Sequence, residues 1–305
     1  MYTNQALLLK RITVILMSLF LATSVLAEDS EDESEDQDTA KAATVQAKDT
    51  PAKTVHGSPD PSTMTDAEKQ AAIAKAATDP SAVLTQLGFF FWTKSSSDNK
   101  NIANTGLFQP VLPLTKKNVL RPALPVINTG GPDGKFGIGD LFLLDVQINQ
   151  ISSGSWGWGG VASLPTATDD TLGSGKWEAG PMFMYINKKA LAHNKSIFGI
   201  LLYNQWSFAG KSDRRDVNFL SFQPIWVHHT GWGYVGWTDI NATIDWENDN
   251  RFSFPVGLRI GKVFPGKTPF NAYIQPYYIF NNKGKDDVWG IKLSGTFIKP
   301  TWLRH

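Results

Sequence analysis

The chain has 305 residues, no cysteine and a formal net charge of +1. Without cysteine there is no disulfide, no thiolate metal site, no cysteine nucleophile and no lipidated N-terminal cysteine. The near balance of charges excludes the basic excess that is typical of a nucleic-acid-binding protein. The sequence therefore predicts no nucleic-acid partner, no cofactor and no metal site.

Residues 1–27 have the three parts of a secretory signal peptide. Lys10 and Arg11 precede an apolar run over 12–27 that ends in small residues. This run is shorter than the about 20 residues that a spanning helix needs, and acidic residues follow it at once, which argues against an uncleaved anchor. We expect cleavage near Ala27. No later stretch is apolar for long enough to predict a spanning helix.

Residues 28–62 are predicted to form a disordered acidic and polar arm. Eight acidic residues lie between Glu28 and Asp38, and large apolar side chains are rare. Such a composition buries too little surface to offset the entropy of the chain. Residues 63–79 are predicted to form a short helix. Its start is the capping-box pattern Thr65-Asp66-Ala67-Glu68, and Asp79-Pro80 ends it.

Residues 80–305 are predicted to form an all-β, antiparallel transmembrane barrel of about 12 strands. Apolar and polar residues alternate, as in the final strand, where Ile291 and Leu293 flank Lys292. In the segment 141–149 the apolar parity begins at Phe142 and the polar parity at Asp145. We expect the apolar parity to face lipid and the polar parity to face the lumen.

Prolines within these segments are unusual for central strands, and eight are present, at positions 110, 113, 122, 125, 181, 224, 255 and 276. They predict bulges or a locally opened wall. The predicted strands lie near 84–93, 104–114, 118–128, 138–151, 154–164, 176–189, 195–208, 216–229, 232–247, 251–264, 269–282 and 286–298. An even strand number places both ends of the barrel chain on the periplasmic side, with short turns there and long loops outside.

Polar side chains of the lumen parity are the candidate lining of a passage or of a closed polar core. The predicted lumen-lining residues are Asp145, Gln147, Glu178, Gln205, Gln223, Asp239, Asn241, Asp245, Arg259, Asn271, Gln275 and Lys292. Barrels of about 8 strands are filled and those of 16–18 are open, so a barrel of intermediate size can be either.

A charged cluster is predicted on two neighbouring outer loops. Its members are Asp169, Asp170, Asp213, Arg214, Arg215 and Asp216. Three interpretations stay open: a polar lock between the loops, arginine contacts to lipopolysaccharide phosphates, or a solvated cluster of little energetic weight.

An enzyme is not expected. A lipid hydrolase needs a serine and a histidine near the outer leaflet, whereas His193, His228 and His229 fall at the predicted periplasmic end. We predict no catalytic residue.

Several spaced motifs resemble the family of outer-membrane barrels labelled phenol-degradation meta-pathway proteins. They are LPTATDD at 164–170, LGSGKW at 172–177, GP at 180–181, NQWSFAG at 204–210, DRRDVN at 213–218, QP at 223–224, DWE at 245–247 and GKV at 261–263. The resemblance implies a transporter-like barrel for aromatic or other small molecules and carries over no active-site residue. The acidic arm and the tail beyond Phe297 depart from the family pattern.

The expected function is a passive channel or transporter in the outer membrane for small molecules, aromatic or hydrophobic ones included. The alternative is a sealed structural or adhesive barrel that binds a partner through its outer loops. Expected partners are outer-membrane lipid, lipopolysaccharide and a small solute; the sequence does not indicate an oligomeric state. The acidic arm is expected either to hover over the periplasmic mouth, where it biases passage toward cations or intermittently blocks the mouth, or to be a solvated tail that aids export.

Overall fold

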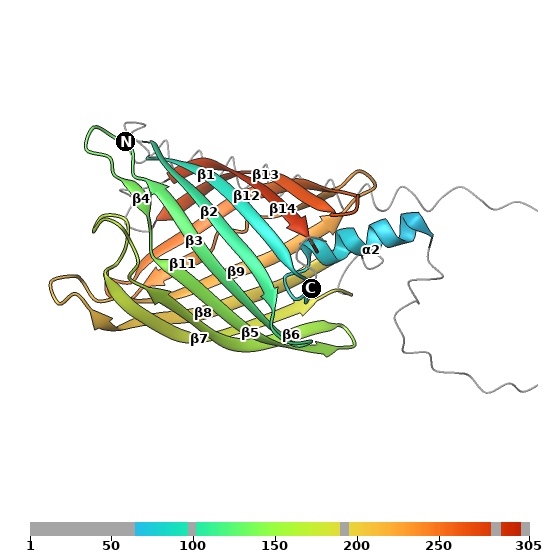
Figure 1. Cartoon of the computed structure of the whole chain (residues 1–305), viewed down its shortest axis with the longest axis horizontal. Helices are drawn as coiled ribbons and strands as arrows, with labels where there is room; N and C mark the ends of the chain where they lie inside the picture. The colour runs from blue at the N-terminus through green and yellow to red at the C-terminus, as the bar shows by residue number, and fades with distance from the viewer. Residues whose placement is uncertain (1–64, 97–101, 190–194, 282–287, 300–305) are drawn as a thin grey trace, which may run out of the picture. The chain divides into compact units, whose positions relative to one another are not determined.

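The computed structural model of the chain describes residues 65–96, 102–189, 195–281 and 288–299 (Figure 1). The predicted signal peptide at 1–27, the predicted arm at 28–62, His193 and the tail beyond residue 299 lie outside the described residues.

The described elements are one helix and fourteen strands of a single antiparallel sheet. They are α2 (Asp66–Thr78), β1 (Gln86–Ser96), β2 (Ile102–Pro113), β3 (Asn118–Asn128), β4 (Phe136–Ile138), β5 (Leu141–Ile151), β6 (Gly154–Leu164), β7 (Lys176–Asn187), β8 (Ser196–Gly210), β9 (Asn218–His229), β10 (Tyr234–Trp237), β11 (Ala242–Asp245), β12 (Arg251–Phe264), β13 (Phe270–Asn281) and β14 (Val288–Ile298).

The sheet closes into a barrel because its first and last strands pair. β1 and β14 run antiparallel, with Phe90 opposite Ser294. β4 and β5 both pair with β3, and β10 and β11 both lie between β9 and β12, so the fourteen strands occupy twelve positions in the wall. The predicted antiparallel barrel of about 12 strands is confirmed, and β3, β6 and β12 have the bounds that the alternation predicted.

The wall is interrupted between β10 and β11. β10 pairs with residues 227–229 of β9 and with residues 258–261 of β12. β11 pairs with residues 219–222 of β9 and with residues 251–253 of β12. Residues 223–226 and 254–257 therefore lack a ladder partner on this side. Pro224 and Pro255 lie in these two stretches, and each pairs only on its other side, with Ile200 and Ile279. Two of the eight prolines in predicted strands thus lie at a local opening of the wall, and the other six lie in strands that pair on both sides.

The two ends of the barrel differ. The turns at 114–117, 152–153 and 265–269 lie at the end where the chain enters β1 from α2, and we call this the short-turn end. The opposite end carries the connections 129–135, 165–175 and 211–217, and we call it the long-loop end. In Figure 1 the short-turn end, with α2, is on the right.

The outer surface is apolar, and so is much of the inner surface. Outward side chains such as Trp158 and Leu293 are 57% and 48% exposed. Inside, buried aliphatic side chains from β2, β3 and β5–β9 form one cluster, which we call the apolar wall; Val146, Met184 and Val227 belong to it. The expected polar interior is therefore wrong for this half of the barrel. Alternation identifies two faces, but it does not say which of them points inward.

α2 begins as the capping box predicts. Thr65 Oγ1 accepts a hydrogen bond from the Glu68 backbone N–H at 3.3 Å, and Glu68 Oε2 accepts one from the Thr65 N–H at 2.8 Å. The helix ends at Thr78, and Asp79 is in an extended conformation before Pro80. Among the described residues, no helix has both the length and the apolar character needed to cross a membrane.

Candidate functional site

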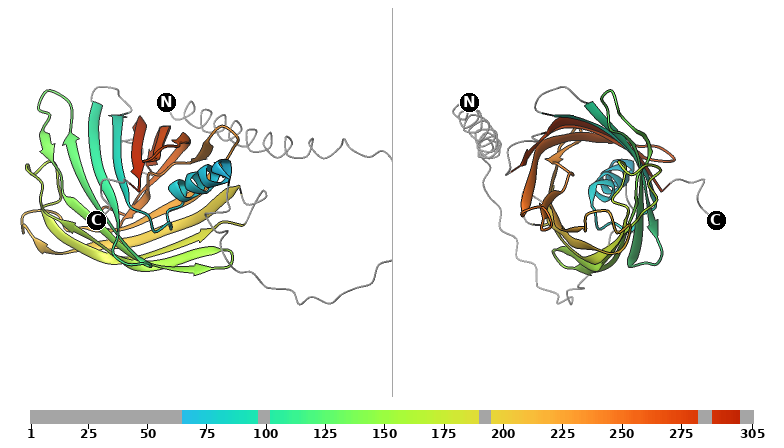
Figure 2. Two further views of the ribbon diagram at one scale, coloured as in Figure 1. Left: turned by 45° about the vertical axis from the view of Figure 1, so that its right-hand side comes forward. Right: turned by 90° about the vertical axis from the view of Figure 1, so that its left-hand side faces the viewer.

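A cavity of about 580 Å³ lies inside the barrel. Its lining comes from most of the wall, including β1, β3, β5, β8, β9 and β12–β14. At the short-turn end it is lined by Ala77, Thr78, Asp79 and Pro80, which are the end of α2 and the residues after it. Seen end-on, α2 projects within the outline of the barrel (Figure 2). We call α2 and residues 79–84 the plug.

Three contacts from different parts of the wall hold the plug. Lys188 Nζ, beyond the end of β7, lies 2.6 Å from Asp79 Oδ2. Arg121 Nη2 on β3 donates to the Pro80 carbonyl at 2.5 Å, and the Thr78 hydroxyl lies 2.8 Å from His229 Nε2 on β9.

The residues after α2 are buried as well as tethered. Ser81 is fully buried and donates from its N–H and its hydroxyl to Asp79 Oδ1, at 2.8 Å and 2.6 Å. Val83 packs against the apolar wall. The plug is therefore part of the barrel interior and narrows the short-turn mouth.

Polar side chains form a belt across three adjacent strands facing the cavity. Gln275 on β13 pairs with Lys292 on β14. Arg259 on β12 lies between the pairs Gly257–Tyr277 and Gly261–Tyr273, at the level of Gln275. We call Arg259, Gln275, Lys292 and Asp239 the charged belt.

Asp239 joins the belt because the chain leaves the wall between β10 and β11. Its backbone N–H donates to Gln275 Oε1 at 3.1 Å, and Gln275 Nε2 donates to Thr238 Oγ1 at 3.0 Å. The belt side chains thus replace ladder bonds that the interrupted strand does not make. Gln275 is fully buried, so these bonds satisfy a polar group that burial would otherwise penalise.

The charges of the belt are only partly matched. Lys292 Nζ lies 3.0 Å from Asp239 Oδ2, and the Tyr273 hydroxyl donates to the same oxygen. The guanidinium carbon of Arg259 lies 5.4 Å and 6.0 Å from the ring centroids of Tyr273 and Tyr234. Arg259 Nε and Asp239 Oδ1 are buried with no hydrogen-bond partner among the described residues. Lys292 therefore neutralises Asp239, and Arg259 keeps its charge toward the cavity.

The remaining cavity lining is largely apolar. Phe142 and Leu144 on β5 and Leu201 on β8 line it, together with Phe90 on β1. In the strand order, β5–β8 lie across the barrel from β12–β14. The cavity is therefore amphipathic, with an apolar wall facing a charged belt.

Several of the predicted lumen-lining residues do line this cavity. They are Gln223, Asp239, Asn241, Arg259, Asn271 and Lys292. Gln275 lies buried within the belt.

Three further predicted residues face inward nearer the long-loop end. Gln205 Nε2 donates to Glu178 Oε2 at 2.6 Å and to Ser163 Oγ at 2.5 Å. Asp245 follows Ile244 at the end of β11 and pairs with Phe219 on β9. These groups are separate from the charged belt.

The prediction for Asp145 and Gln147 is wrong, because both face outward. Gln147 pairs with the exposed Trp158, whereas Leu144 and Val146, the neighbours of Asp145, are buried inside. Asn118 Nδ2 donates to the two carboxylate oxygens of Asp145 at 3.0 Å and 3.1 Å. In β5 it is the apolar parity that joins the apolar wall, so the polar parity points out.

Sequence reasoning missed three lumen residues. Lys94 and Arg121 line the cavity from β1 and β3. Their strands are so largely apolar that period-two alternation gave no lumen assignment. Tyr234, which was not assigned to the lumen, is 1% exposed, and its hydroxyl donates to Asn271 Oδ1 at 2.9 Å. The signal that was available for Tyr234 was its hydroxyl, which needs a partner when buried.

The outer-loop cluster joins the two loops that carry it. Lys211 forms an ion pair with Asp170, and Arg214 Nη2 donates to the Gly173 carbonyl at 2.7 Å. Lys176 Nζ lies 2.8 Å from Asp216 Oδ1. We call these three contacts the loop lock. They favour the lock among the three interpretations, since the cations involved are already engaged.

The other cluster members have separate roles. Arg215 Nη2 lies 2.9 Å from Asp245 Oδ2 and ties the 211–217 loop to β11. Asp169 accepts hydrogen bonds from the Thr171 N–H and hydroxyl, and the backbone bond is the main cause that lowers the pKa of its carboxyl. Asp213 is exposed. The cluster is thus not one site.

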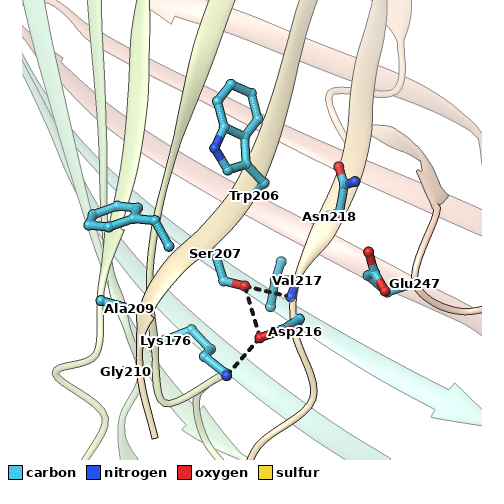
Figure 3. Close-up of a pocket in the computed structure, with 10 residues that line it drawn as sticks. Lys176, Trp206, Ser207, Ala209, Gly210, Asp216, Val217, Asn218 and Glu247 are labelled. Carbon is cyan, nitrogen blue, oxygen red and sulfur yellow. Dashed lines mark hydrogen bonds and ion pairs between the residues drawn. The ribbon is translucent and has the colours of Figure 1, made fainter. Parts of the chain in front are cut away.

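An open pocket of about 510 Å³ lies beside the loop lock (Figure 3). Its lining includes Lys176, Trp206, Ser207 and Asp216. Figure 3 shows Lys176 and Ser207 both directed at Asp216. The hydrogen bond from Lys176, and then its charge, lower the pKa of the Asp216 carboxyl. Asp216 therefore stays ionised, and the contact persists, until the pH falls below the ordinary range of a carboxyl group.

We expect Asp216→Asn to loosen the 211–217 loop. Trypsin cuts after Lys211, Arg214 and Arg215, and its access depends on local opening. Loss of the ion pair with Lys176 should speed cleavage roughly two- to fivefold at pH 8, since the contact is partly exposed. The matched control is Asp213→Asn in the same loop. Equal cleavage rates in the two variants and the parent protein would show that the lock does not hold the loop.

A serine and a histidine meet at the short-turn end. Ser196 Oγ lies 2.8 Å from His228 Nδ1. Among the described residues, no carboxylate is hydrogen-bonded to the His228 ring.

Comparison with known proteins gives a likeness of fold. No family model matches the sequence, and no curated protein matches it. The structure is similar to the crystal structure of an outer membrane channel from Pseudomonas putida F1, with a TM-score of 0.55 and 16% identity. The similarity covers 72% of this chain and 97% of that chain. At this identity the two share the barrel fold, and the resemblance to the phenol-degradation family stays a prediction.

Proposed function

We propose that the protein is a passive channel of the outer membrane for small molecules that are at least partly apolar. The observation that carries the proposal is the amphipathic cavity inside a closed barrel. A cavity of this size is typical of small-molecule sites, and its apolar wall suits solutes that a water-filled polar pore would not favour. The fold of a known outer membrane channel supports the proposal.

The proposed orientation places the short-turn end and the plug in the periplasm. Short periplasmic turns and longer outer loops are the usual arrangement of such barrels. The exposed outward side chains, Trp158 and Leu293 among them, then contact lipid acyl chains. The loop lock lies on the outer face of the membrane.

A second candidate is a sealed barrel that binds a partner through its outer loops. Two observations favour it: the plug narrows one mouth, and the loop lock holds two loops together at the other end. In this case the cavity would be an internal void left by incomplete packing, and it would not be part of a conduction pathway.

Solute flux separates the two candidates. Purified protein reconstituted in liposomes should let the neutral solute benzamide enter faster than it enters empty liposomes, and should add steps of conductance in a planar bilayer. A boiled and an unboiled gel sample should differ in mobility, which verifies that the barrel is folded. Folded protein that passes no solute and no current would favour the sealed barrel.

A further inference from the structure

The cavity has an excess of positive charge. Its lining contains four cationic side chains, Lys94, Arg121, Arg259 and Lys292, but only two acidic ones, Asp79 and Asp239. Each acidic side chain is already in an ion pair, Asp79 with Lys188 and Asp239 with Lys292. Positive charge in a low-dielectric enclosure attracts anions and repels cations.

Two of the cations are available to a solute. Arg259 has a buried Nε without a partner among the described residues, and its guanidinium lies over the rings of two tyrosines. Lys94 is exposed within the cavity that it lines, and it forms no ion pair among the described residues. On β1, Lys94 is the next inward-facing residue after Trp92, and Trp92 pairs with Lys292 on β14. Both free cations thus lie at or beside the charged belt.

The other two cations are committed elsewhere. Arg121 donates to the Pro80 carbonyl, and Lys292 lies 3.0 Å from Asp239 Oδ2. They hold the plug and the belt in place. Their charges still add to the positive potential of the cavity.

The opposite side of the cavity suits an apolar body. Phe142, Leu144 and Leu201 come from strands that lie across the barrel from the belt. A solute with a flat or aliphatic body and one carboxylate would bury the body against these side chains and direct the carboxylate at Arg259. The guanidinium matches a carboxylate geometrically, because two of its N–H groups can bind the two oxygens at once.

We infer that the lumen contains a binding site for amphipathic organic monocarboxylates, with Arg259 and Lys94 as the groups that recognise the carboxylate. The inference rests on the proposed function in that it names the class of solute. Asp239 weakens the attraction for a carboxylate, because its own negative charge reduces the positive charge of the belt.

Binding of three small probes to purified protein in detergent tests the site without requiring passage. Benzoate has a ring and a carboxylate, benzamide has the same shape without the charge, and acetate has the charge without the ring. Isothermal titration should show benzoate binding about tenfold more tightly than either of the others, since hydrogen bonds to charged groups are the stronger ones. Equal binding of benzoate and benzamide would overturn the inference.

Variants then assign the effect to the two cations. Arg259→Gln and Lys94→Gln should each weaken benzoate binding by about tenfold and leave benzamide binding within about twofold. Arg259→Lys keeps the charge and should retain most of the preference. The matched control is Lys262→Gln, which removes the same charge from an exposed position on the same strand, away from the cavity lining. A loss of benzoate binding in Lys262→Gln equal to that in Arg259→Gln would contradict the assignment.

Flux of the same probes distinguishes failure of the site from failure of the channel. Selective benzoate binding without flux of any probe would leave the site intact and reject the channel. Flux of benzoate and benzamide at equal rates, with no benzoate binding, would leave the channel intact and reject the site.

Discussion

Deletion of residues 65–83 is expected to raise single-channel conductance and benzamide flux severalfold. This segment contains all of the plug except residue 84, and it lines the cavity at the short-turn mouth. It contributes no strand to the ladder, which closes between β1 and β14, so the barrel should assemble without it. Unboiled gel mobility verifies assembly, and planar bilayers give the conductance.

A milder change should act in the same direction. Lys188→Gln removes the ion pair with Asp79 and should increase the frequency of large conductance events, because one of the three tethers of the plug is lost. Lys189→Gln is the matched control, an exposed neighbour with the same change in charge. If the deletion and Lys188→Gln both conduct like the parent protein, the plug does not lie in the conduction path.

Lys292→Met is expected to reduce the free energy of unfolding by about 3 kcal/mol. The change leaves the buried Asp239 carboxylate without its cation, and removal of one partner of a buried pair typically costs about 3–5 kcal/mol. We expect the lower end because both side chains border the cavity and keep 10% and 15% exposure. Guanidinium titration in detergent, followed by tryptophan fluorescence, measures the loss.

The double variant shows whether the loss comes from the pair. Asp239→Asn with Lys292→Met removes both charges and should regain most of the lost stability, because no uncompensated charge stays buried. Lys262→Met, on the outer face of β12, should change stability little. If the double variant is as unstable as Lys292→Met alone, the stabilising element is the contact of the Lys292 ammonium with the rings of Phe90 and Trp92 rather than its pair with Asp239.

Local pattern predicted most elements of this protein, but it predicted one strand over 232–247 where the structure has β10 and β11 with a break between them. Period-two alternation predicted the number of wall positions and the bounds of β3, β6 and β12, because the pleat of a strand is a property of consecutive residues. The capping box predicted the start of α2, because its hydrogen bonds join residues three apart. Eight prolines in predicted strands indicated that the wall could open, but only Pro224 and Pro255 lie at the interruption, so the prolines did not say where it opens.

The direction of each face was decided only when the barrel closed. Ile291 and Leu293 face out as predicted, whereas Leu144 and Val146 show the same alternation and face in. The sequence determined that each strand has two faces, but the packing of β5–β9 around a shared apolar interior decided which one is inside. For the same reason Asp145 and Gln147 were assigned to the wrong side.

The candidate site depended still more on tertiary structure. Asp239 is 36 positions before Gln275 in the chain, and Gln275 is 17 positions before Lys292. The three residues meet because the chain leaves the wall between β10 and β11, which brings Asp239 to β13 and β14, two and three positions away in the wall. Sequence alone determined that a barrel would form and which polar residues its strands carry. Tertiary structure decided that the helix enters the mouth and that the charges face an apolar wall, because both depend on contacts between segments distant in the chain.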